Sequence, residues 1–233
     1  MDILYQDDRI VVAVKPVGVL STDEPGGMPE LLRAQLHTDC IRTVHRLDAQ
    51  VSGVMVFARS RMAAALLSQQ IRERRFTKEY LAVLCGTPSQ PSGILTDLLA
   101  RDPQRRLTYV ADTPSPSARE ARLSFATVDS SDGMTLVRVR PHPPDTGAAR
   151  PHQGARRAPP RRGRTHQIRV QFASRGLPLA GDRKYGASDA PYPIALWSCR
   201  LSFVHPQTCK PVTFTCPPPD TAPWDLFTLP EML

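Results

Sequence analysis

Two short polar stretches, more than a hundred residues apart, constrain how this chain can fold. The first is His45-Arg46-Leu47-Asp48, followed by Ser52-Gly53, and the second is the segment 163–169, which reads Gly-Arg-Thr-His-Gln-Ile-Arg. Each places charged and hydrogen-bonding side chains beside apolar ones, next to small residues that let the backbone turn tightly. If the fold brings Asp48 beside Arg169, the guanidinium favours the ionised carboxylate, which can act as nucleophile or base. The two stretches therefore outline an active site.

The charge of the chain favours a polyanionic partner. Its 233 residues carry a formal net charge of +8, which is typical of proteins that bind nucleic acid, although a basic surface without a partner is the plain alternative. Residues 146–181 contain no Asp or Glu. Eight arginines lie in the same segment: Arg150, Arg156, Arg157, Arg161, Arg162, Arg164, Arg169 and Arg175. Clustered arginines release counterions from a nucleic-acid backbone, so this distribution favours phosphate binding.

Several other classes of protein are disfavoured by the sequence. The five cysteines are odd in number and contain no CxxC pair, which favours reduced structural thiols over a zinc site or a disulfide framework. Cys199, Cys209 and Cys216 with His205 match no common metal spacing. The N-terminal segment has acids where a targeting peptide needs bases, and no apolar run approaches the ~20 residues of a membrane span. We expect a cytoplasmic protein without membrane association.

Local patterns predict short strands and few helices. Strands are expected at residues 10–14, 54–58, 77–84, 121–127 and 135–139, and a hairpin is expected between 201–204 and 212–215. In the third strand Tyr80, Ala82 and Leu84 share one face, and Leu81 and Val83 share the other. Residues 141–162 contain Pro, Gly, Ala and Arg and almost no large apolar side chain, which indicates a long surface loop.

Three helices are expected. One covers residues 29–36, and a second follows Ser60, which can cap it at the N-terminus. The apolar face of that second helix is expected to hold Ala63, Leu66, Leu67 and Ile71. Thr165 is expected to cap a third, short helix whose Ile168 and Phe172 point inward. Strands with few helices predict a single α+β domain.

Six segments of the chain, taken in order, resemble the RluA-type RNA pseudouridine synthases. They are 5–8 with 14–18; 45–48 with 52–53; 76–80; 163–170; 181–182 with 185–186; and 201–203 with 205–206. The resemblance implies one catalytic domain over 1–233, with a mixed, mostly antiparallel sheet, flanking helices and a basic cleft. Many relatives carry an additional N-terminal S4-like RNA-binding domain. This chain starts directly on the catalytic domain, so we expect it to lack that domain.

The resemblance also implies an activity and a set of site residues. Family members convert uridine in RNA to its C-linked isomer without cofactor or metal. Their catalytic aspartate falls on Asp48, their active-site tyrosine on Tyr80 and their aspartate-pairing arginine on Arg169. The arginine often assigned to base flipping falls on Arg46. Further RNA contacts are expected from Lys78, Arg164, His45 and His166, and from Arg156, Arg157, Arg161 and Arg162 of the long loop. For His45 and His166, however, a structural role as hydrogen-bonding residues is the better explanation.

The chain departs from the family pattern at three positions outside the predicted chemistry. Val51 stands where Thr is usual, Gln171 where His is common, and Trp197 where His is expected. The long loop before Gly163 also exceeds the usual length, which bears on RNA specificity more than on activity.

Three questions stay open at this level. Asp48 can either attack the anomeric carbon of the sugar or remove a proton from its neighbour. The fold can also serve a non-catalytic RNA-binding or ribosome-assembly factor. An Asp-dependent glycosidase or nucleosidase is a third class, but that chemistry needs two opposed carboxylates, and we expect no second acid to accompany the motifs. The substrate is expected to be ribosomal or transfer RNA, and the protein a monomer.

Overall fold

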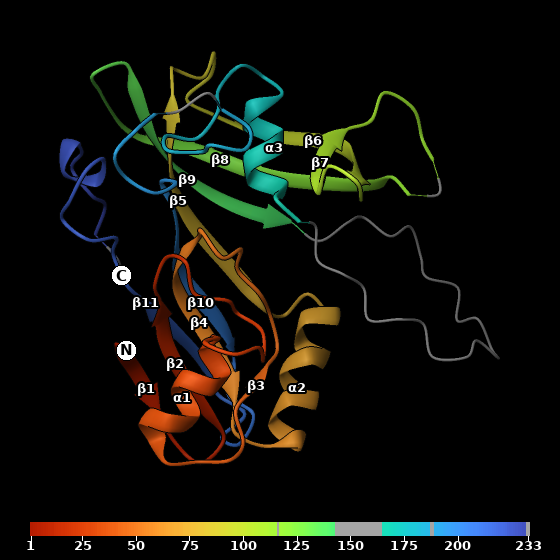
Figure 1. The fold of residues 1–233 in the computed structure, drawn as a ribbon, viewed down its shortest axis with the longest axis vertical. Helices are drawn as coiled ribbons and strands as arrows, with labels where there is room; N and C mark the ends of the chain where they lie inside the picture. Colours follow the sequence, from red (N-terminus) through yellow and green to blue (C-terminus); the bar gives the residue numbers. More distant parts are fainter. Residues whose placement is uncertain (116, 143–164, 187–188, 232–233) are drawn as a thin grey trace.

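A single sheet of eleven strands runs through the described part of the chain (Figure 1). The computed structural model describes residues 1–115, 117–142, 165–186 and 189–231. In chain order the strands are β1 (Ile3–Gln6), β2 (Ile10–Lys15), β3 (Arg42–Thr43), β4 (Ser52–Ala58), β5 (Thr77–Cys85), β6 (Ser92–Asp102), β7 (Leu107–Val110), β8 (Arg119–Ser131), β9 (Met134–His142), β10 (Leu196–Val204) and β11 (Pro211–Thr215).

The order of strands across the sheet is β1-β2-β4-β10-β5-β9-β8-β6-β7, with β3 added beside β4 and β11 beside β10. The described pairings of named strands are antiparallel except that of β4 with β10. Strand β10 pairs with β4 through Trp197 and Ser198, and then with β11 from Arg200 onward. The predicted α+β class with a mixed, mostly antiparallel sheet is therefore confirmed.

Within the described residues, three α-helices flank the sheet: α1 (Met28–Leu36), α2 (Arg61–Arg72) and α3 (Gln167–Ala173). A short 3-10 helix, η1, covers Trp224–Leu226. Figure 1 shows α1 and α2 beside the half of the sheet that contains β1–β4, and α3 beside the half that contains β6–β8. Ser60 caps α2 as predicted, because its hydroxyl accepts a hydrogen bond from the backbone N–H of Ala63 at 3.1 Å.

Two details of the predicted helices are wrong. Leu66 is exposed rather than part of the buried face of α2, whose buried residues are Ala63, Leu67 and Gln70. Gln70 replaces it because its side-chain amide exchanges two hydrogen bonds with the backbone of Val204 at the end of β10. Helix α3 begins after His166, not Thr165, and His166 has a left-handed backbone (φ 59°) without a side-chain cap.

Strand β5 lies in the middle of the sheet and is buried on both faces. The alternation of its side chains is as predicted: Tyr80, Ala82 and Leu84 join the core cluster that contains Leu47, Ile168 and Phe172, whereas Leu81 and Val83 join a second cluster with Trp224 and Phe227. Burial on both faces restricts the side-chain rotamers, because packing in such cores is close to crystalline. Tyr80 is therefore held by a rigid support.

The predictions missed part of the sheet. Strands β1, β3, β6 and β7 were not expected, and β8 extends beyond the predicted 121–127 at both ends. Pro141 and His142 belong to β9 rather than to the long loop, and residues 143–162 of that loop lie outside the described residues. Among the helices described, none is long and apolar enough to cross a membrane.

Candidate active site

The loop that carries Asp48 connects β3 to β4 and is tied down on both sides of the aspartate. Before it, the hydroxyl of Ser21 donates to the carbonyl of Leu47 at 2.7 Å and accepts from the Leu47 N–H at 3.1 Å. After it, the carbonyl of Ala49 accepts from Lys15 Nζ at 2.9 Å and from the N–H of Gly18 at 2.8 Å. With both neighbours fixed, the Asp48 carboxylate has a defined position although its side chain is 29% exposed.

Lys15 is the support that links this loop to the sheet. It ends β2 and is fully buried. Its ammonium donates to the carbonyls of Pro16, Val19 and Ala49 at 2.8, 2.7 and 2.9 Å. Three acceptors match the three protons of a lysine ammonium. Burial lowers the pKa of Lys15 to about 8, and the charge of Asp48 opposes that shift.

Helix α3 brings Arg169 to Asp48. Its guanidinium Nη1 lies 3.5 Å from Asp48 Oδ2, so the predicted proximity of the two polar stretches is observed. The tighter partner of Arg169 is Asp182, whose two oxygens accept from Nε at 2.8 Å and from Nη2 at 2.6 Å. The side chains of Arg169 and Asp182 are only 7% and 0% exposed. Asp182 thus fixes the plane of the guanidinium, which leaves Nη1 for Asp48.

Burial and charge shift the pKa values of Arg169 and Asp182 in opposite directions. Burial alone would lower the pKa of Arg169, but the hydrogen bond and charge of Asp182, together with the charge of Asp48, raise it. Burial would likewise raise the pKa of Asp182, but the hydrogen bond and charge of Arg169 and two backbone N–H groups hold it below the ordinary value. Both groups are therefore charged at neutral pH.

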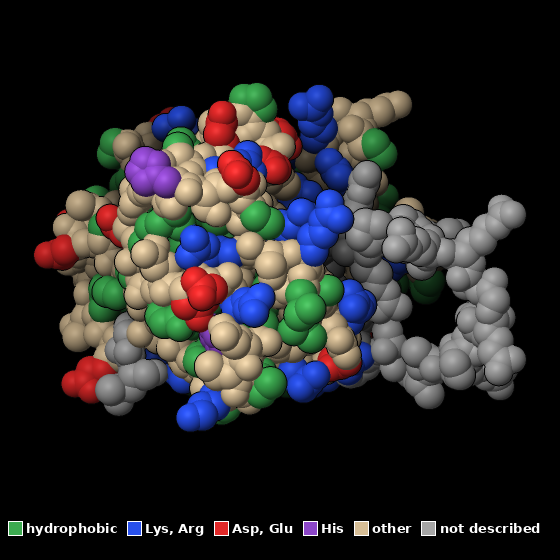
Figure 2. Space-filling model, turned by 90° about the horizontal axis from the view of Figure 1, so that it is seen from below, with side chains coloured by type: hydrophobic (Ala, Val, Ile, Leu, Met, Phe, Trp, Pro, Cys, Tyr) green, Lys and Arg blue, Asp and Glu red, His purple; other side chains and the backbone are tan. Residues whose placement is uncertain are grey.

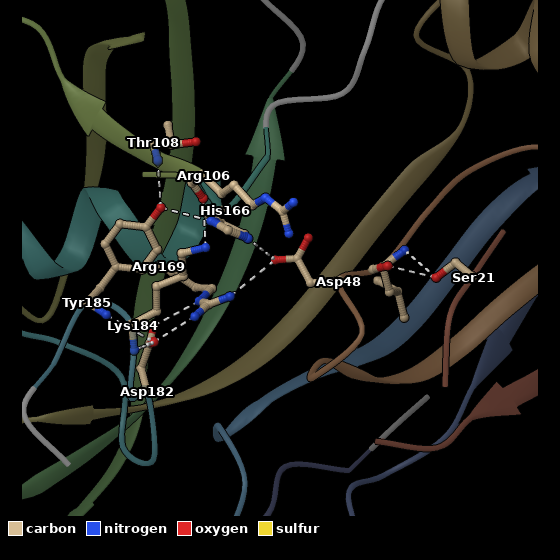
Figure 3. Close-up of polar contacts among 10 residues, drawn as sticks. Ser21, Asp48, Arg106, Thr108, His166, Arg169, Asp182, Lys184 and Tyr185 are labelled. Atoms are coloured by element: carbon tan, nitrogen blue, oxygen red, sulfur yellow. Dashed lines mark hydrogen bonds and ion pairs between the residues drawn. The ribbon is translucent and has the colours of Figure 1, made fainter. Parts of the chain in front are cut away.

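Two further side chains, His166 and Tyr185, complete the surroundings of Asp48 that Figure 3 shows. His166 precedes α3, and its Nε2 lies 3.5 Å from Asp48 Oδ2. The other ring nitrogen, Nδ1, lies 2.8 Å from the hydroxyl of Tyr185. The ring of Tyr185 lies under the guanidinium carbon of Arg169, with 5.2 Å between that carbon and the ring centroid. Tyr185 therefore contacts both nitrogen-bearing side chains that approach Asp48.

Tyr80 reaches the same region from β5. It is buried, and burial, with the charge of Asp48 as a second cause, raises the pKa of its hydroxyl above the ordinary value. Its side chain is consequently a neutral phenol at neutral pH, which can donate a hydrogen bond and offer a flat ring for stacking.

The remaining predicted contact residues fall into three groups. Arg46 is exposed beside Asp48, and Lys78 is half-buried on β5, where burial lowers its pKa to about 8 and its ammonium lies 5.6 Å from the centroid of Phe76. His45 is wrong as an RNA contact: it is buried, and its Nε2 accepts from the backbone N–H of Val56 at 3.2 Å. This matches the alternative structural explanation of His45. Arg156, Arg157, Arg161, Arg162 and Arg164 lie outside the described residues.

On the face seen from below (Figure 2), positive charge is interrupted by acidic and uncharged side chains. Figure 2 shows Lys and Arg side chains distributed over the face seen from below, with acidic side chains among them. The basic cleft that the family resemblance implies stays a prediction. Where the chain is described, no group of three or more His, Cys, Asp or Glu side chains is placed to hold a metal ion.

Comparison with known proteins assigns the family. A profile of the RNA pseudouridylate synthase family matches residues 9–174. The dual-specificity RNA pseudouridine synthase RluA of Escherichia coli (strain K12) is 31% identical over 227 residues, which cover 92% of this chain and 92% of that protein. Its namesake from Yersinia pestis is 30% identical over 229 residues, covering 93% of this chain and 98% of that protein. The chain belongs to the RluA-type RNA pseudouridine synthases.

The fold of this pseudouridine synthase agrees with a solved structure. Human RNA pseudouridylate synthase domain containing 1 superposes with a TM-score of 0.76 at 22% identity, covering 100% of this chain and 91% of that one. The superposition confirms the predicted catalytic-domain fold, whereas the family match shows that the chain is an RNA-modifying isomerase.

Sequence reasoning missed four supporting residues of this synthase: Ser21, Lys15, Asp182 and Tyr185. Lys15, Asp182 and Tyr185 lie in segments that carried the family resemblance, but no role was assigned to them. The expectation that no second acid accompanies the motifs is also wrong, because Asp182 pairs with Arg169. Its oxygens accept from Arg169 and from the N–H groups of Lys184 and Tyr185. Fully buried and paired, Asp182 cannot serve as the second carboxylate of a glycosidase.

Proposed function

We propose that this synthase isomerises uridine in structured RNA with Asp48 as the reacting group. One observation carries the assignment: a partly exposed carboxylate on a fixed loop faces a buried guanidinium that a second carboxylate holds in place. Such an arrangement holds the Asp48 carboxylate beside a fixed cation and partly open to solvent, where a uridine can reach it. A protein that only binds RNA gains nothing from this arrangement.

The reaction breaks the bond between N1 of uracil and the anomeric carbon, turns the base, and joins C5 to the same carbon. A proton leaves C5 and a proton is taken up at N1, so no electrons are gained or lost. The Asp48 carboxylate can serve both open routes, attack on the anomeric carbon or removal of the neighbouring sugar proton. Tyr80, as a neutral phenol, stacks on the uracil or donates a hydrogen bond to it.

Access to a paired uridine requires that the base leave its stack, which costs a few kcal/mol. The exposed Arg46 next to Asp48 is suited to fill the gap, because a guanidinium stacks and hydrogen-bonds at once. Loop uridines and deformable stems are therefore the preferred targets. Lys78, and the arginines of the long loop with Arg164, supply phosphate contacts in this proposal.

Relatives with about 31% identity carry the description dual-specificity RNA pseudouridine synthase. This supports ribosomal and transfer RNA as the substrate classes of this chain. A monomer in the cytoplasm, where those RNAs are modified and thiols stay reduced, completes the proposal.

The decisive test replaces Asp48 with Asn, which keeps the size and removes the negative charge. Pseudouridine would be mapped in total RNA from cells that contain the wild type, Asp48→Asn, or no copy of the gene, and in purified transcripts that contain each mapped site. We expect loss of product with RNA affinity nearly intact. An exposed variant, Asp23→Asn, is the matched control. Near-normal product from Asp48→Asn refutes the assignment, and a wild type that binds RNA but forms no product anywhere indicates the non-catalytic alternative.

A further inference from the structure

His166 lies where it can control the orientation of the Asp48 carboxylate. Its side chain is 12% exposed, and its left-handed backbone turns the ring away from α3 into the space between Asp48 and Tyr185 (Figure 3). Nε2 lies 3.5 Å from Asp48 Oδ2, and Nδ1 lies 2.8 Å from the hydroxyl of Tyr185. The imidazole therefore bridges a phenol and the proposed reacting group.

The protons in this bridge follow from the donors around Tyr185. The backbone N–H of Thr108 donates to the Tyr185 hydroxyl oxygen at 2.9 Å, and a backbone amide can only donate. The phenol keeps one proton of its own, and Nδ1 of His166 lies within its reach. With the phenol donating to Nδ1, the neutral imidazole carries its proton on Nε2, where the acceptor is the carboxylate.

The opposite tautomer is unfavourable. It would place the unprotonated lone pair of Nε2 against the negatively charged Oδ2 of Asp48, with no proton between them. The doubly protonated ring is disfavoured because burial, and secondarily the nearby Arg169 and Lys184, lower the pKa of His166 against the opposing charges of Asp48 and Asp182. A neutral ring with its proton on Nε2 satisfies every contact.

The support of Tyr185 comes from the β6–β7 hairpin. Thr108 lies on β7, and the carbonyl of Arg106, just before β7, accepts from Lys184 Nζ at 2.7 Å. Two hydrogen bonds thus hold the segment 184–185 to this hairpin. The Tyr185 hydroxyl is thus held by the Thr108 N–H as well as by its contact with His166, which makes it a stable donor.

The two nitrogen groups that approach Asp48 meet the same oxygen. Arg169 Nη1 and His166 Nε2 each lie 3.5 Å from Oδ2, whereas Oδ1 has no polar partner among the described residues. Resting on the proposed function, we propose that His166 is a positioning residue, held as the Nε2–H tautomer by Tyr185, which with Arg169 retains Oδ2 and presents Oδ1 as the reacting oxygen. The 3.5 Å separations shorten when RNA closes the site, as catalytic hydrogen bonds commonly do.

The first test reads the tautomer directly and does not depend on activity. In protein labelled with ¹⁵N at histidine, NMR shifts distinguish the two ring nitrogens, and the His166 signal is assigned by its absence in His166→Gln. We expect the Nε2–H tautomer in the wild type. Tyr185→Phe, which keeps the ring and removes the hydroxyl, should give a mixture of tautomers. A wild type with the proton on Nδ1, or a Tyr185→Phe spectrum identical to the wild type, overturns the proposal.

The second test uses two side chains of nearly equal shape. His166→Gln retains an N–H donor near the position of Nε2, and His166→Met has the same length without a donor. We expect kcat to fall roughly tenfold in His166→Met, the size of one charge-assisted hydrogen bond, with partial recovery in His166→Gln and little change in KM for RNA. Equal kcat in the two variants, or a wild-type value in His166→Met, overturns the proposal.

The two tests separate this proposal from the proposed function. If Asp48→Asn retains activity, the assignment of Asp48 fails, whatever the tautomer of His166. If Asp48→Asn is inactive but the spectrum shows the Nδ1–H form, the function stands and the role of His166 fails. Should His166→Met not fold, the spectra of the wild type and Tyr185→Phe still decide.

Discussion

Substitution of Asp182 by Asn tests the central electrostatic feature of this site. The variant keeps the size of the side chain but removes the charge that faces Arg169. Asn also presents an N–H₂ group toward one guanidinium N–H, so one of the two hydrogen bonds at 2.6 and 2.8 Å is lost. The guanidinium then retains Asp48, at 3.5 Å, as its nearest carboxylate.

The size of the effect follows from burial. The side chains of Arg169 and Asp182 are 7% and 0% exposed, and loss of one partner from a buried pair costs about 3–5 kcal/mol because the other charge stays buried and unpaired. In a domain of this size each kcal/mol lowers Tm by about 2–4 °C, so Tm should fall by about 6–20 °C.

Urea unfolding followed by circular dichroism measures this loss, and the chain offers a matched control. Asp23 also accepts two hydrogen bonds from one guanidinium, from Nη2 and Nη1 of Arg33 at 2.6 and 3.0 Å, but its side chain is 60% exposed. Asp23→Asn should be hard to distinguish from the wild type, because solvent screens such pairs. Similar losses in the two variants would refute the argument from burial.

The same pair predicts a pH dependence. The folded-state pKa of Asp182 lies below its ordinary value, so its stabilisation is complete above the unfolded value of about 3.9 and is lost as the pH falls through the folded value. The stability of the wild type should therefore approach that of Asp182→Asn below about pH 4. A difference in free energy of unfolding between the wild type and Asp182→Asn that stays constant down to pH 2 contradicts the lowered pKa of Asp182.

Three further substitutions probe the supports of the site. Ser21→Ala leaves the buried N–H and C=O of Leu47 without their side-chain partner. The free energy of unfolding in urea should therefore fall by about 1–3 kcal/mol, and kcat should fall as well. An unchanged kcat would show that the loop does not need these two hydrogen bonds. Gly53→Ala would place a Cβ 2.4 Å from the backbone oxygen of Ser198, in a left-handed conformation (φ 117°), so little folded protein should accumulate in a solubility assay; a normal yield would contradict that geometry. Ser60→Ala removes the cap of α2 and should cost about 1 kcal/mol in the same unfolding assay, and no change would mean that the cap contributes nothing.

The predictions that depended on short-range periodicity were the most successful. The β5 alternation of Tyr80 and Leu81 was readable because a strand places neighbours on opposite faces whatever surrounds it. Strand β6 was missed because Leu98, Leu99 and Ala100 follow one another without alternation, and the strand is specified by its long pairing with β8. Gln70 is buried instead of Leu66 for a similar reason: a backbone partner on β10 favours burial of the Gln70 side-chain amide.

The sequence by itself determined the family, many of the local elements, and the identity of the two groups that approach each other in the site, Asp48 and Arg169. Only the tertiary structure decided which partners those two groups contact and how closely. Arg169 pairs more tightly with Asp182 than with Asp48, and His166 contacts the carboxylate while His45 is buried away from it. Side-chain type and spacing are local properties that a sequence displays directly. The strength of a charge interaction depends instead on distance and burial, which packing sets among residues far apart in the chain.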